Sequence, residues 1–188
     1  MNETGYFWYD RAEPFGNVAL PDVNTDMISE AFWLVKGEEF KITQSNDVHH
    51  TSLLSTQGSC LNTNTFRAKI SSYGVFKNET VWASDSCQGS CAIAYSGHYT
   101  TVQGFGLSQC DGEIQSRANI GFWCDYSVGD GAVMMIGGGG TTCDRADHGI
   151  GITEENAAKF LTSGTEYDFG NDALIIPTQE YSLNLWIR

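Results

Sequence analysis

The sequence predicts an α+β domain built mainly on an antiparallel sheet, with short helices and with long loops tied by disulfides. Short β-type runs recur along the chain, and glycine, serine or asparagine separates each run from the next. Helix-type periodicity is confined to two short stretches. The chain has 188 residues, of which 41% are hydrophobic, and this size suits a single domain over residues 1–188.

The N-terminal part is expected to hold the first helix and the first strand. Residues 1–28 begin with four adjacent aromatic side chains and continue with turn residues, so they are expected to be a divergent or interface-forming segment. Residues 24–34 predict a short helix, because apolar positions recur at spacings of three and four before Gly37. Residues 40–43 predict a strand, and residues 45–64 a polar loop.

The rest of the chain predicts strands, one helix and a closing strand. The helix is expected from 154 to about 162, with Thr153 as its N-cap. The closing residues alternate apolar and polar side chains, which places Leu183, Leu185 and Ile187 together on the core face. The other strands are predicted at 66–70, 80–83, 92–95, 99–102, 120–124, 132–136 and 150–153.

The charge of the chain excludes several partners. The formal net charge is −13, and no run of lysine or arginine is present, so neither nucleic acid nor an anionic membrane surface is expected to bind. No apolar stretch reaches the roughly 18 residues of a membrane helix, so we expect no membrane insertion. The opening MNETGYFWYD lacks the basic start and apolar core of a signal peptide, which leaves a cytosolic protein, a mature form or a fragment.

Six cysteines favour a secreted, extracellular protein with disulfides. Two glycosylation sequons, at Asn2 and Asn78, agree with a secreted glycoprotein. The alternative is zinc, because Cys87 and Cys91 have a C-x3-C spacing. Six cysteines allow about 15 pairings. Pairing in chain order joins Cys60 to Cys87, Cys91 to Cys110 and Cys124 to Cys143, and the last of these is favoured because it would close a glycine loop.

Carboxylates around that glycine loop predict a structural calcium site. Residues 137–140 are four glycines, whose backbone carbonyls are accessible, and carboxylate and amide oxygens are calcium ligands. The alternative is that these acidic residues form turns. The candidate metal ligands fall in two groups, the first comprising Asp125, Asp130, Asp144 and Asp147 and the second Asp168, Asn171 and Asp172.

The sequence offers no signature of an enzyme. It lacks a nucleophile elbow, a zinc-protease motif and a phosphate loop, and the cysteines are expected to be paired. We therefore expect a protein that is not an enzyme. The tryptophans within apolar runs are expected in the core: Trp33, Trp82, Trp123 and Trp186.

The glycine run and its flanks resemble the C-terminal half of the intelectins, or X-type lectins. Residues 136–140, the cysteine and aspartate that follow them, and a closing apolar strand that ends in arginine carry this resemblance. Residues 122–125 and 30–34 resemble pieces of the wider fibrinogen-related group, of a marine invertebrate type. The resemblance implies a fibrinogen C-terminal-like fold, secretion, disulfides, structural calcium and glycan binding.

The resemblance does not transfer completely to this chain. In intelectins, the segment before the glycines supplies ligands to a calcium that holds a sugar diol. Asp130 can stand for the family's asparagine, but Ala132 and Val133 occupy the positions of its glutamate and histidine. The family's sugar site is therefore not expected here, whereas Asp144 and Asp147 match the position of a structural-calcium aspartate.

Two functions follow from these observations. The first is a secreted, calcium-stabilised, lectin-like domain that binds extracellular glycans. The second is a structural subunit of an extracellular matrix or filament, which would self-associate with other copies or bind other extracellular proteins through a sheet edge or its N-terminal segment. Sugars stack on aromatic rings, so the candidate ligand contacts are Tyr95, His98, Tyr99, Tyr126, His148 and Tyr167.

Overall fold

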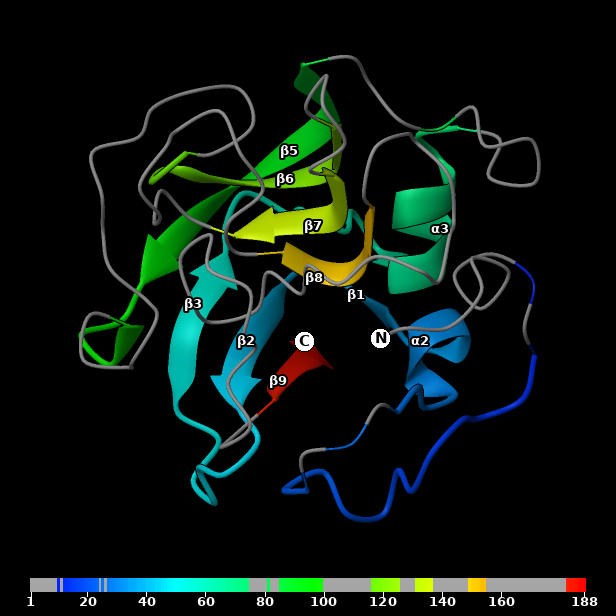
Figure 1. Ribbon diagram of the computed structural model, residues 1–188, viewed down its shortest axis with the longest axis vertical. Helices are drawn as coiled ribbons and strands as arrows, with labels where there is room; N and C mark the ends of the chain where they lie inside the picture. Colours follow the sequence, from blue (N-terminus) through cyan, green and yellow to red (C-terminus); the bar gives the residue numbers. More distant parts are fainter. Residues whose placement is uncertain are drawn as a thin grey trace.

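The described part of the chain forms a seven-stranded antiparallel sheet with two short helices beside it (Figure 1). In this computed structural model the sheet order is β8-β7-β6-β5-β3-β2-β9, and β1 and β4 form a separate antiparallel pair. No described helix is long and apolar enough to cross a membrane. The structure describes residues 10, 12–23, 25, 27–74, 81, 85–99, 116–125, 131–136, 149–154 and 182–188.

The elements follow the chain in the order helix, strands, helix, strands. Those of the N-terminal half are α2 (Ala31–Leu34), β1 (Lys36–Gly37), β2 (Phe40–Gln44), β3 (Ser52–Thr56), β4 (Asn64–Thr65) and α3 (Phe66–Ser71). Those of the C-terminal half are β5 (Ser86–Tyr95), β6 (Asn119–Asp125), β7 (Gly131–Ile136), β8 (Gly149–Glu154) and β9 (Leu183–Ile187).

The long strand β5 joins two halves of the sheet. Its C-terminal residues 93–95 pair with β3, and its residues 86–92 pair with β6. In the sheet order, β5 lies between the group β6, β7 and β8 and the group β3, β2 and β9. Ten residues are about twice the usual length of a strand, which is what allows β5 to serve both halves.

The core lies where α3 packs on the sheet. Thr65 caps α3 because its hydroxyl oxygen accepts a hydrogen bond from the amide of Ala68, at 3.1 Å. Phe66 and Ile70, four residues apart on α3, are both buried. The ring of Phe66 lies 5.3 Å from that of Phe40, in an edge-to-face arrangement, so β2 and α3 share one hydrophobic cluster.

Two glycines leave room for bulky groups on β5 and β6. A Cβ atom on Gly89 would overlap the ring of Tyr73, which stacks on Phe122 with a centroid distance of 5.7 Å. A Cβ atom on Gly121 would overlap the sulfur atoms of Cys87 and Cys124. Glycine is therefore required at both positions by close approach of a neighbouring group.

Trp123 anchors β6 to the end of α3. Its ring is fully buried, and its indole Nε1 donates a hydrogen bond to the carbonyl of Ile70, at 3.2 Å. Its backbone has a φ of 50°, which is uncommon for so large a residue in a strand. The buried ring and its hydrogen bond are the contacts that hold this strained backbone in place.

The predicted fold class agrees with this structure, but several predicted elements do not. Residues 66–70 form a helix rather than a strand, and β3 lies within the predicted loop 45–64. Only 31–34 of the first predicted helix is helical, because Ile28 instead forms a bridge with Phe15. The strand predictions at 40–43, 92–95, 120–124, 132–136 and 150–153 and the closing strand are confirmed.

Candidate functional site

The described part of the chain contains two disulfides, and their pairing differs from the pairing in chain order. Cys60 is bonded to Cys91 and Cys87 to Cys124, so all three pairs expected from chain order are wrong: Cys60–Cys87, Cys91–Cys110 and Cys124–Cys143. Cys87 and Cys124 lie directly opposite each other on β5 and β6. Strand register, which chain order does not reveal, therefore decides this pair. Cys110 lies outside the described residues.

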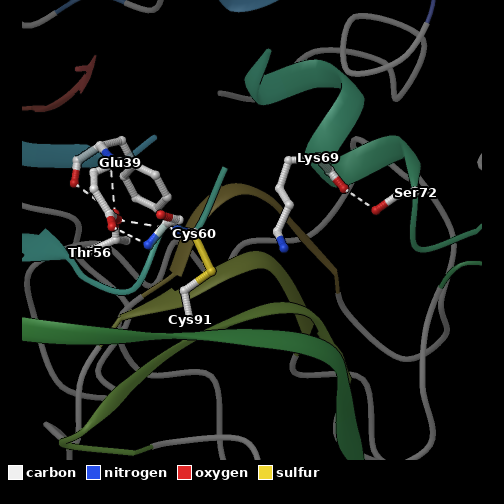
Figure 2. Close-up of a disulfide and its surroundings, with 8 residues drawn as sticks. Glu39, Thr56, Cys60, Lys69, Ser72 and Cys91 are labelled. Carbon is white, nitrogen blue, oxygen red and sulfur yellow. Dashed lines mark hydrogen bonds between the residues drawn. A yellow bond between two sulfur atoms is a disulfide. The ribbon is translucent and has the colours of Figure 1, made fainter. Parts of the chain in front are cut away.

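A partly buried network fixes the loop that carries Cys60 (Figure 2). The Glu39 carboxylate accepts hydrogen bonds from the Thr56 hydroxyl and from the backbone amides of Ser59 and Cys60. Gly58 and Ser59 have φ values of 74° and 59°, and consecutive amides in such a bend converge on an anion. Figure 2 places this carboxylate beside the Cys60–Cys91 disulfide, so both tie the loop to the sheet.

Charged, polar and aromatic side chains lie around the β2–β3 hairpin and its neighbours, β9 and the turn after β5. We call them the hairpin surface: Lys41, Gln44, Asp47, His50, His98 and Trp186. They come from β2, from the loop between β2 and β3, from the turn after β5, and from β9. Three backbone elements that are distant in sequence therefore have to meet to form it.

An aromatic pair forms one part of the hairpin surface. The His50 and Trp186 rings lie 4.7 Å apart between centroids, at an angle of 49°. The Trp186 Nε1 donates a hydrogen bond to the hydroxyl of Thr43, at 2.8 Å, which fixes the orientation of the indole. Lys41, directly opposite Trp186 on β2, donates from its Nζ to the carbonyl of His50, at 2.9 Å.

Trp186 corrects the expectation that it belongs to the core. Its neighbours in β9, Leu185 and Ile187, pack against the core, and side chains alternate along a strand. Trp186 therefore points to the opposite, outer face, where it is half-buried. A row of neighbouring residues crosses four strands on this face: Trp186, Lys41, Ser55 and Ala94.

A polar group of side chains forms the other part of the hairpin surface. The Asp47 carboxylate accepts hydrogen bonds from the backbone amides of His49 and Thr51, at 2.9 and 2.8 Å. A hydrogen bond from the Thr51 side chain and those two amides lower the pKa of Asp47 to about 2. His98 Nε2 lies 3.1 Å from the Gln44 Oε1, so the turn after β5 is bonded to β2.

The predicted ligand contacts are only partly in a position to bind. His98 is half-buried on the hairpin surface, but Tyr99 is fully buried with its ring 4.3 Å from that of Tyr95. A buried ring has no free face for a sugar, so Tyr99 acts in packing. Burial, and then the neighbouring Tyr99, raise the pKa of Tyr95. Tyr126, His148 and Tyr167 lie outside the described residues.

The predicted calcium ligands fall almost entirely outside the described residues. Asp125 ends β6, half-buried and opposite Ser86. Within the described ranges, no three histidine, cysteine, aspartate or glutamate side chains are grouped as metal ligands. The remaining candidates lie outside these ranges: Asp130, Asp144, Asp147, Asp168, Asn171 and Asp172. The glycine run 137–140, Cys143 and the sequons at Asn2 and Asn78 also lie outside them.

Comparison with protein-family models, curated proteins and solved structures found no match to this chain. The resemblance to intelectins stays a prediction. Of the residues of the hairpin surface, only His98 is a candidate ligand contact from the sequence. The alternation of the closing strand was the signal that could have identified Trp186, because it assigns that residue to the face opposite Leu185.

Proposed function

We propose that this protein is an extracellular recognition domain that binds glycans at the hairpin surface. The observation that carries the proposal is the Trp186 and His50 aromatic pair with the Lys41 ammonium beside it, on the outer face of β2 and β9. The apolar face of a sugar ring can pack on an aromatic side chain, and its hydroxyl groups can bond with the polar groups. A sugar needs a flat aromatic surface and polar side chains that include both hydrogen-bond donors and hydrogen-bond acceptors.

Two further features support an extracellular binding role. Disulfides persist in oxidising surroundings, and the described part of the chain contains two of them. The formal net charge of −13 disfavours nucleic acid, whereas neutral glycans carry no charge that it would repel. The proposed glycan contacts do not require a metal ion, because the side chains of the hairpin surface supply them.

The experiment that tests the proposal is a glycan array followed by affinity measurements on the variants Lys41→Ala and Lys36→Ala. Lys41 lies opposite Trp186 and is bonded to His50, whereas the exposed Lys36 lies in β1 and serves as the matched control. We expect Lys41→Ala to weaken binding at least tenfold and Lys36→Ala to leave it unchanged. A folded wild-type protein that binds no glycan on the array would contradict the proposal.

The same array with calcium and with EDTA separates this proposal from a calcium-dependent sugar site. Binding at the hairpin surface is expected to persist in EDTA at a temperature where the protein remains folded. Complete loss of binding in EDTA, without loss of folded protein, would instead indicate a sugar held by calcium and would contradict the assignment to the hairpin surface.

A further inference from the structure

The last strand in the sheet order, β9, presents at the sheet edge backbone groups that are not paired with any described residue. Within the described part of the chain, β9 pairs only with β2. The amide of Arg188 donates to the carbonyl of Glu39 at 2.9 Å, and the amide of Glu39 donates back at 3.0 Å. Along an antiparallel ladder, hydrogen-bonded residue pairs alternate with pairs that are not hydrogen-bonded. The reciprocal Glu39–Arg188 pair therefore establishes which residues of β9 bond to β2.

Because hydrogen-bonded pairs alternate along the ladder, the backbone groups of three residues of β9 point away from β2. The amide of Ser45 also donates to the carbonyl of Ser182, at 2.9 Å, which agrees with the same alternation. The amide and carbonyl groups of Leu183, Leu185 and Ile187 therefore point to the outer edge, while their side chains pack against the core. No described residue bonds to these six backbone groups, so another strand can pair with them.

We propose that two copies of this chain pair through β9, antiparallel and with a two-fold axis at Leu185. In that register Leu185 faces Leu185 of the second copy, and Leu183 faces Ile187. Each of the three residues with outward-pointing backbone groups therefore faces a residue of the second copy whose backbone groups also point outward, as a two-fold interface requires. The arrangement would join the two seven-stranded sheets into one continuous sheet.

The charges of the chain favour this edge for contact between copies. The formal net charge of −13 makes copies repel each other, but Leu183–Ile187 contains no charged residue and no proline. Arg188, at one end of β9, is exposed, and Asp47 follows Ser45, which is bonded to Ser182 at the other end. Antiparallel pairing brings Arg188 of each copy opposite Ser182 of the other, towards the end at which Asp47 lies, so the charges that approach each other at the two ends have opposite signs.

Exposed apolar side chains enlarge the contact beyond the strand itself. The side-chain amide of Asn184 donates to the carbonyl of Pro21, at 2.7 Å, which holds residues 18–23 beside the outer face of β9. Val18, Leu20 and Val23 in this segment are 41%, 49% and 37% exposed. In the proposed register this apolar segment lies beside the junction of the two β9 strands and would lose contact with water.

Sedimentation velocity of the full chain, from low micromolar to several hundred micromolar, tests the proposal. We expect twice the mass of the chain at the upper concentrations. Arg188→Glu should weaken the dimer at least tenfold, because it places two carboxylates together at each end of the interface. Lys36→Glu, an exposed lysine in β1, changes the charge equally and should leave the dimer unchanged. A wild-type monomer at all concentrations, or equal effects of both variants, would overturn the proposal.

A second pair of variants tests the backbone contacts directly. Leu185→Pro removes an amide that points away from β2, so it should abolish the dimer without breaking the β2–β9 ladder. Leu185→Ala retains the amide and should remain a dimer. If circular dichroism finds Leu185→Pro unfolded, the comparison of Arg188→Glu with Lys36→Glu decides. A folded Leu185→Pro that dimerises like the wild type would refute pairing at β9, whatever the protein binds at its hairpin surface.

Discussion

At the scale of single residues, the close packing of the Tyr73 ring on the sheet depends on a glycine, which has no side chain. Tyr73 lies over Gly89 and stacks on Phe122, the residue opposite Gly89 on β6. The ammonium of Lys69 lies 5.4 Å from the centroid of the same ring. The ring therefore joins α3 to two strands, and it does so in the space that a side chain at position 89 would fill.

Gly89→Ala is expected to destabilise the protein by about 1–3 kcal/mol, because the new methyl group would displace the Tyr73 ring. Chemical unfolding measures the change. Gly97→Ala is the matched control, since no heavy atom lies within 4 Å of its added Cβ. The effect of Gly89→Ala should shrink in a Tyr73→Ala background, and equal effects in both backgrounds would count against a clash with this ring.

Asp47 is expected to contribute stability that depends on pH. Its pKa is lowered from the ordinary value of 3.8 to about 2, so its hydrogen bonds stabilise the folded state fully above pH 3.8. This stabilisation is lost as the pH falls towards about 2. The melting temperature of Asp47→Asn should therefore fall less than that of the wild type as the pH is lowered from 3.8 to about 2. That of Asp22→Asn, at another surface position, should fall as much as that of the wild type. An unchanged pH profile in Asp47→Asn would disprove this role.

At the scale of elements, helix α3 illustrates why a short apolar run is ambiguous. Residues 66–70 alternate well enough to suit a strand, but Phe66 and Ile70 are also spaced for one face of a helix. The Thr65 cap and the packing of both side chains against β2 and β6 favour the helix. The cap was visible in the sequence, whereas the packing partners were not.

The two disulfides are expected to stabilise elements that lie far apart in sequence. They close loops with separations of 31 and 37 residues, and the chain-entropy argument assigns about 3–4 kcal/mol to each. Cys60→Ala with Cys91→Ala, and Cys87→Ala with Cys124→Ala, should each lower the free energy of unfolding by about 2–4 kcal/mol. Peptide mapping of the unreduced protein checks the pairing, and a peptide linking Cys124 to Cys143 would contradict it.

At the scale of the whole molecule, a structural calcium ion stays a prediction from the acidic residues around the glycine run. If calcium binds there, EDTA should lower the melting temperature, because the ion stabilises only the folded state that presents its ligands. EDTA already saturated with calcium serves as the control. An unchanged melting curve in EDTA would eliminate structural calcium, and it would leave the proposed glycan contacts unaffected.

Sequence alone determined the features that depend on local pattern. The antiparallel β class, most strands of the C-terminal half and the inward face of β9 all follow from alternation and turn residues, which act between near neighbours. The disulfide pairing, the strand β3 and the assembly of the hairpin surface were decided only by the tertiary structure. Each depends on which strands become neighbours, and contacts such as Trp186 with Thr43 join residues 143 positions apart.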